Sequence, residues 1–343
     1  MSVTESPMAG TLRGTFSFYV SASNQNQIRE CAELADSVVV CGPAGPLAVS
    51  RMRSDGWTGT VIFDRCDYAP RATPADASRW LAEQESAGAD RLLSPGRWVG
   101  WGLDQPSFID QVAAESNLVG DRDATIVLAV DSHWLTKSRG QDAMIEALRS
   151  LARPTALVLA DRADPLSHPG AVSGLIALTR SVDQLSILRT DHGAIGALAF
   201  DAAHGSIGLT PSHRHFIPPS ATGSAIPNDR SARVFMADLM DWFTANTIAS
   251  WSPVTGSPTC RYPCCEGARI DRFFDERRKS DADLHNRTVL AALADDILFA
   301  PAEDRRRRFA ILCRNAIERY GPMGGWMTEI TPKAQLRQWA QFA

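Results

Sequence analysis

Short apolar runs rich in β-branched residues recur along the first 210 residues of this chain, and they constrain its fold more than any other feature. Each run is nearly continuously apolar, whereas a strand with one face in water alternates apolar and polar residues. The pattern therefore predicts strands that are covered on both faces. These strands are expected at residues 15–20, 37–41, 60–63, 91–93, 125–130, 156–160, 185–188 and 197–200, with a weaker run at 206–209.

Stretches with a helical period lie between most of these runs. Residues 27–35, 75–86, 142–151 and 172–182 are the clearest, and each predicts a helix. Strands that alternate with helices form parallel βαβ units. We therefore predict an α/β fold. A (β/α)8 TIM barrel is favoured over an open doubly wound sheet, because no G-x-G-x-x-G motif follows the first strand.

The composition excludes several classes of protein. Of the 343 residues, 44% are hydrophobic and 22% are charged, which is unlike a disordered or fibrous chain. No apolar run reaches the roughly 18 residues of a membrane span, and no signal-like segment opens the chain, so we expect a soluble, cytoplasmic protein without a membrane partner. The net charge of -4 argues against an overall attraction to nucleic acid, although it allows a local basic face.

Aspartates follow several of the predicted strands. In parallel barrels the active site lies at the carboxyl ends of the strands, so carboxylates there are candidates for binding or for acid–base chemistry. The alternative is that each aspartate forms a turn or caps a helix. The residues in question are Asp64, Asp131, Asp161, Asp191 and Asp201.

A cluster of cysteines lies in the last third of the chain. Cys260, Cys264 and Cys265 fall within six residues, and His285 follows at the start of a predicted helix. Structural zinc takes four tetrahedral ligands, and Cys3His is one of its usual sets. The pattern predicts a structural zinc ion with no ligand position left for water. Two alternatives remain: the four residues are incidental, or Cys264 is a bystander because adjacent cysteines rarely bind one ion without strain.

The sequence changes in character near residue 217, where a stretch rich in Pro, Gly and Ser begins. Helical patterns return at 233–243, 285–299 and 306–320, and the cysteine-rich turn lies between the first two. We predict a barrel over residues 1–216 and a loop or lid with a helix over 217–258. Residues 259–343 are expected to form a zinc-binding helical subdomain that packs on the barrel.

A cysteine cluster followed by a His-Asn pair, after a barrel, resembles the zinc subdomain of the tRNA-guanine transglycosylases. The family motif is Cys-x-Cys-x2-Cys. Here Cys260 and Cys265 match its first and third cysteines, Tyr262 stands at the second, and Cys264 takes the place of the missing thiolate. The pair at 285–286 matches the family's His-Asn. The resemblance covers the last third of the chain and the barrel in outline, and it implies exchange of a guanine or 7-deazaguanine base in nucleic acid.

The same resemblance assigns roles in the barrel. The family has a general base at the end of an early strand, and Asp64 is similar to it. Its nucleophilic Asp follows a late strand, but the corresponding segment here, 206–214, has no carboxylate at the matching place. Asp191 and Asp201 are the further catalytic candidates. Because a covalent exchange needs a nucleophile, the chain is either a divergent ribosyl transferase or a relative that binds nucleic acid without catalysis.

Other polar residues lie near the ends of the late strands. Gly-rich turns there suit a phosphate or ribose ligand, although they are equally compatible with ordinary turns. We predict substrate contacts from Asp131, His192, His204 and Arg214. The expected partners are tRNA or DNA and a guanine-type base, and the sequence is compatible with a homodimer.

A second reading is a metal-dependent hydrolase. His213 and His215 form an H-x-H motif just past the last strand, and two such imidazoles can bind a metal together with a barrel carboxylate. The arginine run at 305–308 is a candidate basic strip for a phosphate backbone, but acidic residues near the other C-terminal arginines favour a solvated face of mixed charge.

Overall fold

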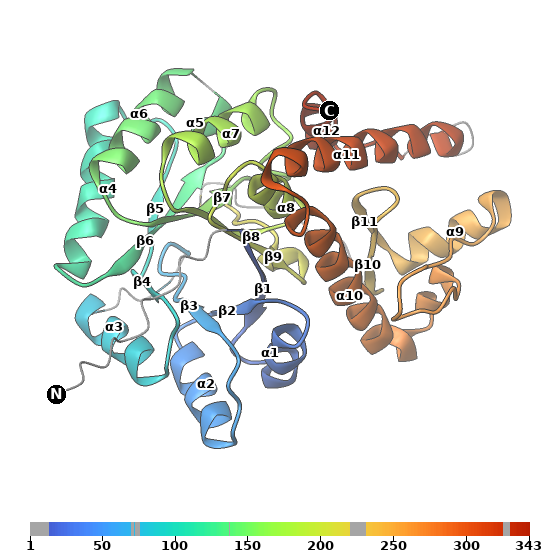
Figure 1. Ribbon diagram of the computed structural model, residues 1–343, viewed down its shortest axis with the longest axis horizontal. Helices are drawn as coiled ribbons and strands as arrows, with labels where there is room; N and C mark the ends of the chain where they lie inside the picture. Colours follow the sequence, from blue (N-terminus) through green and yellow to red (C-terminus); the bar gives the residue numbers. More distant parts are fainter. Residues whose placement is uncertain (1–13, 70–71, 73–75, 137, 220–230, 325–329) are drawn as a thin grey trace.

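Nine strands form one parallel sheet in the order β3-β2-β1-β9-β8-β7-β6-β4, and β5 also pairs with β6 (Figure 1). The computed structural model describes all residues except 1–13, 70–71, 73–75, 137, 220–230 and 325–329. The strands are β1 (Thr15–Ser21), β2 (Ser37–Cys41), β3 (Val61–Asp64), β4 (Leu92–Leu93), β5 (Arg97–Val99), β6 (Ala124–Asp131), β7 (Thr155–Ala160), β8 (Leu185–Thr190) and β9 (His204–Gly208).

The sheet is nearly closed into a barrel. Strand β4 pairs with the start of β6 and β5 with its end, so the nine strands occupy eight positions. A parallel bridge between Ile62 and Arg91 joins β3 to the residue before β4, which brings the two edges of the sheet together. The predicted α/β class and parallel strands are therefore confirmed as a barrel-like sheet.

Burial on both faces explains the continuously apolar strands. One set of alternate side chains fills the inside of the ring, among them Tyr19, Val39, Ile62, Val127 and Leu188. The other set packs outward against the helices, as Phe18, Val38 and Phe63 do. Both sets are removed from water, so neither face selects polar residues.

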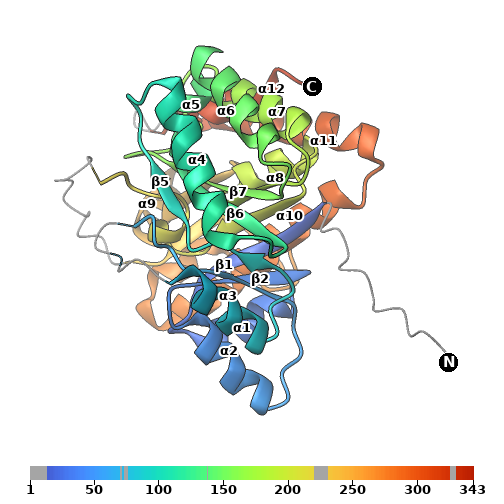
Figure 2. The ribbon, with the colours of Figure 1, turned by 90° about the vertical axis from the view of Figure 1, so that its left-hand side faces the viewer.

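Helices follow most of the strands and cover the outside of the ring. In Figure 2, α4 crosses in front of the strands, and α5, α6 and α7 lie above them. The helices of the barrel are α1 (Gln25–Ala32), α2 (Gly45–Ser54), α3 (Ala77–Ser86), α4 (Gln105–Val119), α5 (His133–Thr136), α6 (Ser138–Ser150), α7 (Ala171–Ser181) and α8 (Gly193–Ala199). The predicted helices correspond to α1, α3, α6 and α7, whereas α2, α4, α5 and α8 have no counterpart among the predicted helices.

One predicted strand is wrong. Residues 197–199 form the end of the fully buried helix α8, and Phe200 is its C-cap. Short apolar runs cannot be assigned to helix or strand by periodicity alone, and here β8 and β9 already supply the neighbouring strands. As a consequence, Asp201 follows a helix and precedes β9, so it lies at the end of the barrel opposite the carboxyl ends of the strands.

One predicted helix is also wrong. The segment 233–243 forms a hairpin of β10 (Arg233–Met236) and β11 (Asp241–Thr244), with antiparallel pairing. Its turn includes Met240, whose φ of 50° interrupts any helix. The Thr244 side chain then accepts from Thr247 N at 3.0 Å and caps the next helix, α9 (Ala245–Thr255).

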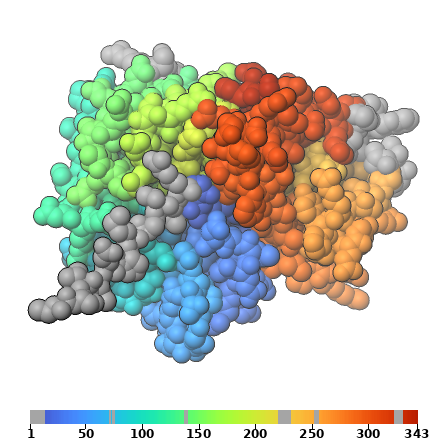
Figure 3. Space-filling model, viewed as in Figure 1, coloured from blue at the N-terminus to red at the C-terminus, as the bar shows by residue number. Residues whose placement is uncertain are grey.

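The C-terminal part forms a lobe beside the barrel, visible in orange and red in Figure 3. It contains the hairpin, α9, the cysteine-rich turn with two short 3-10 helices, α10 (Lys279–Leu298), α11 (Ala302–Gly324) and α12 (Ala334–Ala340). The Asn286 side chain accepts from Phe235 N and donates to Arg233 O, both at 2.7 Å, so α10 holds the edge of the hairpin. The predicted helices at 285–299 and 306–320 are confirmed.

His204 lies at the base of the barrel interior. It starts β9, level with Thr15 in β1, whereas the mouth of the barrel lies at the opposite ends of these strands. Its Nε2 contacts Ser17 Oγ at 2.7 Å, and the residue is 2% exposed. Burial, with a smaller contribution from the charge of Arg91, lowers the pKa of His204 to about 3. We therefore assign His204 to the interior, and the expectation that it binds substrate is corrected.

This buried histidine makes the fold sensitive to acid. In the unfolded chain His204 takes up a proton below a pKa of about 6.5, whereas in the folded barrel it stays neutral down to about 3. The unfolded state then binds more protons, so stability falls as the pH falls through this window. At pH 5 we expect His204 to account for a loss of about 2 kcal/mol relative to pH 7.

Urea unfolding at pH 7 and pH 5 measures this effect in the wild type and in His204→Gln. The variant should lose about 2 kcal/mol less between the two pH values. His133→Gln, at a partly exposed side chain, serves as the control and should keep the wild-type difference. An equal loss in the wild type and in His204→Gln would show that His204 does not set the acid sensitivity.

Candidate metal centre and barrel mouth

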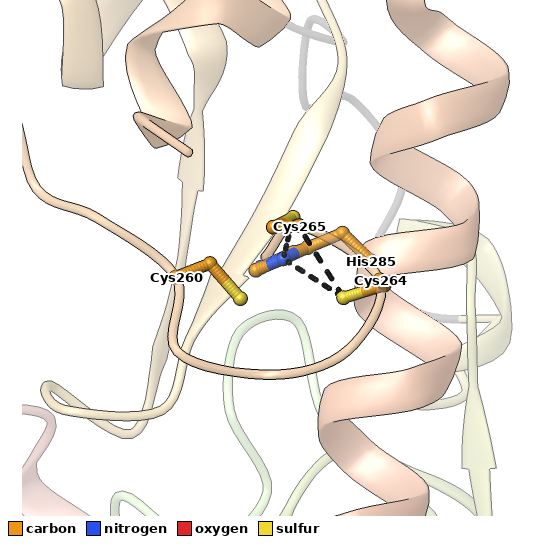
Figure 4. Close-up of side chains that lie close together, drawn as sticks. All are labelled: Cys260, Cys264, Cys265 and His285. Atoms are coloured by element: carbon orange, nitrogen blue, oxygen red, sulfur yellow. Dashed lines mark hydrogen bonds between the residues drawn. The ribbon is translucent and has the colours of Figure 1, made fainter. Parts of the chain in front are cut away.

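A tight turn gathers the three cysteines (Figure 4). Cys260 N donates to Ala268 O at 3.1 Å, and Gly267 N donates back to Cys260 O at 2.9 Å, so the chain reverses direction around the cluster. Gly267 has a φ of 81°, which a glycine adopts without strain. The local sequence therefore brings Cys264 and Cys265 back beside Cys260.

The helix α10 brings His285 to the same point. His285 Nδ1 lies 3.4 Å from Cys265 Sγ and 3.9 Å from Cys264 Sγ, and the two sulfurs are 3.7 Å apart. All four ligand atoms, including that of Cys260, lie within 4.8 Å of one another. The adjacent cysteines, which sequence reasoning left in doubt, thus both belong to the cluster.

The distances fit a tetrahedral ion. Metal–sulfur bonds of about 2.3 Å in a tetrahedron separate two sulfurs by about 3.8 Å, close to the 3.7 Å between Cys264 and Cys265. His285 Nε2 donates to Phe235 O at 3.0 Å, which leaves Nδ1 with its lone pair toward the sulfurs. Burial lowers the pKa of His285, so the imidazole is neutral and able to ligate. This group could therefore hold a metal ion.

The surroundings also suit the charge of such a site. Three thiolates and a neutral imidazole around a divalent cation carry one net negative charge. The Arg272 guanidinium donates to Cys265 Sγ at 3.2 Å and supplies a compensating positive charge. The Phe273 ring, 5.4 Å from the His285 ring, closes the site on another side. Without an ion, burial raises the pKa values of Cys264 and Cys265 and favours neutral thiols.

Four aspartates at the carboxyl ends of the strands share one local structure. In each, Oδ1 accepts the backbone N–H two residues further along, at 2.8–3.0 Å, which is an Asx turn. The four are Asp64, Asp131, Asp161 and Asp191. One carboxylate oxygen of each aspartate therefore forms a turn, as the alternative interpretation predicted. Any binding or acid–base chemistry of these aspartates would fall to the other oxygen, Oδ2. Asp201 lies at the far end of the barrel and forms an ion pair with Arg306.

Asp64 is the most deeply buried of these carboxylates. Its Oδ2 accepts from Tyr19 Oη at 2.6 Å and from Tyr68 Oη at 2.7 Å, while Oδ1 accepts from Cys66 N at 2.9 Å. Burial, followed by the charge of Asp64, raises the pKa values of both tyrosines, which therefore remain protonated donors. Asp64 is thus held in one position inside the mouth.

Asp131 and Asp161 each hold a histidine that sequence reasoning missed. Asp131 Oδ1 contacts His133 Nδ1 and Asp161 Oδ2 contacts His168 Nε2, each at 2.7 Å, and the two imidazole rings lie 4.9 Å apart. No described residue donates a hydrogen bond to Oδ2 of Asp131. The Asp-x-His spacing was the one available signal for His133, whereas the approach of His168 depends on the fold.

Asp191 lies at the mouth but is tied into a buried ionic network. Its Oδ2 is 3.1 Å from Lys333 Nζ, which is also 3.0 Å from Asp241 Oδ1 in the hairpin. Gln335 Nε2 donates to Asp191 Oδ2 at 3.2 Å. Burial by itself would lower the pKa of Lys333, but the Asp191 and Asp241 charges outweigh it and raise that pKa. Asp191 therefore connects the barrel to the C-terminal lobe.

Two further predicted ligand contacts are buried beside this network. His192 is fully buried, and among the described residues neither ring nitrogen has a hydrogen-bond partner. Arg214 donates to Gly208 O at 3.3 Å and to Leu209 O at 3.0 Å, and its guanidinium lies 3.2 Å from the centre of a Trp242 ring. Arg214 thus fixes the chain after β9 against the hairpin.

The end of β9 is closed to any side chain at Gly208. A Cβ added to Gly208 would lie 2.0 Å from the carbonyl oxygen of His213, so this position cannot carry a side chain without moving the backbone. The segment after β9 folds back over the strand end in a 3-10 turn, Pro211–His213. The chain that returns in this turn therefore packs directly against the backbone at Gly208.

The hydrolase reading receives no support from this geometry. His213 Nε2 lies 3.6 Å from Cys41 Sγ, and His215 is largely buried, with its pKa lowered mainly by that burial. Within the described part of the chain, only the Cys3His cluster brings three or more possible metal ligands close enough to hold one ion. The two histidines of the H-x-H motif are therefore not assembled as a metal site.

The arginines of the C-terminal lobe are largely engaged. Arg305 donates to Ala300 O at 3.0 Å and to Leu298 O at 2.7 Å, which caps the end of α10. Arg306 pairs with Asp201, and Arg308 lies 3.6 Å from Asp296. These contacts agree with a face of mixed charge.

No family model matches this sequence, and no curated protein matches it. None of the helices in the described part of the chain is long and apolar enough to cross a membrane.

Proposed function

We propose that this protein is a divergent relative of the tRNA-guanine transglycosylases, a (β/α)8 TIM barrel with a structural zinc ion that acts in the cytoplasm. In this proposal it is a pentosyltransferase that exchanges a guanine-type or 7-deazaguanine base in tRNA or DNA. The observation that carries the proposal is the cluster of Cys260, Cys264, Cys265 and His285, which follows a parallel barrel-like sheet in the chain, after a hairpin and α9.

The choice of zinc rests on the ligands. Three thiolates and one imidazole in a near-tetrahedral arrangement suit zinc, and a site with four protein ligands suits a structural role. A bound ion would hold the cysteine-rich turn to α10, and α10 in turn holds the hairpin through Asn286. A zinc ion at this site would therefore stabilise the C-terminal lobe and would take no part in the reaction.

The barrel mouth supports base exchange through two carboxylates. Asp64, held by Tyr19 and Tyr68, would transfer a proton to and from the bases. Asp131 lies in the same ring of strand ends, and its Oδ2 is available to accept N–H groups of a guanine edge. A base that reaches these groups has to leave its stack, as bases do in other enzymes that modify them.

The proposal predicts a strong effect of Asp64→Asn. The change keeps the size of the side chain but removes its ability to carry a proton, so we expect base exchange to fall by about 10²–10⁴-fold. The assay follows labelled guanine into bulk tRNA and into DNA, with the zinc content of each protein checked first. Asp201→Asn, the same change at the opposite end of the barrel, is the control and should leave exchange within about twofold.

Two results would overturn parts of this account. Unchanged exchange in Asp64→Asn would remove Asp64 from the mechanism while leaving the transferase. Salt-dependent binding of nucleic acid without exchange, by a folded and metal-loaded wild type, would instead leave a non-catalytic binding relative.

A further inference from the structure

Cys41 lies in the barrel mouth beside Asp64. It is the last residue of β2 and pairs in register with Ser21 of β1 and Asp64 of β3. Its side chain belongs to the interior cluster and is 8% exposed. The thiol is therefore in the same layer of the barrel as the proposed acid–base residue.

A histidine faces this thiol across the mouth. His213 Nε2 lies 3.6 Å from Cys41 Sγ, and the same ring packs edge-on against Tyr19 with centroids 5.6 Å apart. His213 is the last residue of the 3-10 turn Pro211–His213. The same turn packs so closely on Gly208 that this position has no room for a side chain. The structure thus places a thiol–imidazole pair beside the strand end where a carboxylate was expected.

This pair has the features of an activated nucleophile. A hydrogen bond with Cys66, opposed by burial and assisted by His213, lowers the pKa of Cys41 to about 6. The Cys66 thiol takes the opposite role, because its interaction with Cys41 and its burial raise its pKa. Of the two thiols, Cys41 therefore loses its proton more readily, and the thiolate is the reactive form.

The carboxylates of the mouth are less suited to attack. Asp64 accepts three hydrogen bonds, and Asp161 accepts from Ser132, His168 and Ala163. Asp191 is bound to Lys333. Hydrogen bonds and ion pairs stabilise a carboxylate and hold its oxygens in place, so each of these groups loses nucleophilicity. Asp131 keeps one oxygen without such a contact among the described residues, and it is the competing candidate.

Building on the proposed base exchange, we propose that Cys41, paired with His213, is the catalytic nucleophile that takes the place of the missing aspartate. The substrate class is a nucleotide within a nucleic-acid strand, attacked at C1′ of its sugar. The intermediate is a strand linked to Cys41 through a carbon–sulfur bond.

The steps balance without an added oxidant or reductant. In the first, the Cys41 sulfur forms a bond to C1′, the C1′–N bond pair leaves with the departing base, and that base takes up a proton that Asp64 relays from water. In the second, the incoming base loses its ring N–H proton to Asp64 and attacks C1′. The sulfur–carbon bond pair then returns to Cys41 as a thiolate beside His213. Two displacements retain the configuration of the sugar.

The experiment traps the intermediate. Wild-type protein is incubated with labelled tRNA or DNA in the absence of an incoming base and then denatured. We expect one strand per chain, attached to the peptide that contains Cys41. A sulfur-linked strand should survive neutral hydroxylamine and be released by mercuric ion, whereas a strand esterified to a carboxylate is released by hydroxylamine.

Variants give an independent measurement. Cys41→Ala should lower exchange by at least about 10³-fold, whereas Cys31→Ala, which removes a buried thiol on α1, should stay within about threefold. His213→Gln should move the rising limb of the pH profile upward from near 6, and Cys66→Ala should move it further, because the Cys66 hydrogen bond lowers the pKa of Cys41 more than His213 does. Unfolding temperature and metal content are compared in every variant, so that a folding defect is not read as a catalytic one.

The outcomes distinguish a wrong assignment of Cys41 as the nucleophile from a wrong assignment of base exchange as the function. Exchange retained in a folded Cys41→Ala, or a strand attached to Asp131, would overturn the assignment of Cys41 and leave the transferase. Absence of exchange with both nucleic acids in the wild type would overturn the proposed function, and the nucleophile with it.

Discussion

Cys265→Ser is expected to release the metal ion and to unfold the C-terminal lobe. Binding of structural zinc contributes about 10–16 kcal/mol in zinc-finger peptides at neutral pH, and this energy is folding energy wherever the site orders the chain. Here Cys265 Sγ lies 3.4 Å from His285 Nδ1, and the cluster joins the cysteine-rich turn to α10. We expect about one equivalent of zinc in the wild type and much less in the variant.

Elemental analysis and thermal unfolding measure the two parts of this effect. Cys264→Ser asks whether both adjacent cysteines ligate, and it should lose metal as Cys265→Ser does. Cys66→Ser is the matched control, because Cys66 lies in the barrel mouth outside the metal cluster, and its metal content should equal that of the wild type. A metal-free wild type with an unfolding temperature unchanged by chelator would contradict a structural zinc.

Lys333→Met should destabilise the protein by about 3 kcal/mol. Removal of one partner of a buried ion pair leaves the other charge without compensation and costs about 3–5 kcal/mol. The lower end applies because the Lys333 side chain keeps 26% exposure. Both Asp191 in the barrel and Asp241 in the hairpin lose their cation, so the contact between barrel and lobe should weaken. Urea unfolding gives the free energy.

Two further variants test this explanation. Lys279→Met, at an exposed lysine that begins α10, is the matched control and should change stability by less than about 0.5 kcal/mol. Asp191→Asn in the Lys333→Met background should recover part of the loss, because it removes the uncompensated carboxylate. If Lys333→Met unfolds like the wild type, the network is not what joins the lobe to the barrel.

The sequence allowed the strands of the barrel to be predicted because burial on both faces leaves a continuous apolar run. The same signal failed at 197–200, where a buried helix with small residues, α8, has a similar composition. It also failed at 233–243, where the two strands of a short hairpin are mostly buried. Because neither strand alternates apolar and polar residues, its sequence resembles that of a buried helix. Local pattern alone cannot distinguish these cases.

The metal cluster could be predicted because three of its residues lie together in the sequence. The role of Cys264 could not, since it depends on how the turn returns past Gly267. The pairing of Lys333 with Asp191, 142 residues apart, left no local pattern. The approach of His213 to Cys41, 172 residues apart, left none either. Contacts between residues this far apart are set by the topology of the fold, which no local pattern records.

The most direct measurement of the central proposal is a base-exchange assay with the zinc-loaded wild type, labelled guanine or a 7-deazaguanine, and both tRNA and DNA. The account predicts that label enters one of the two nucleic acids and that an equal amount of unlabelled base is released. Absence of label from both, with the protein folded and one zinc bound per chain, would contradict it. The likeness to the transglycosylases would then be one of architecture alone.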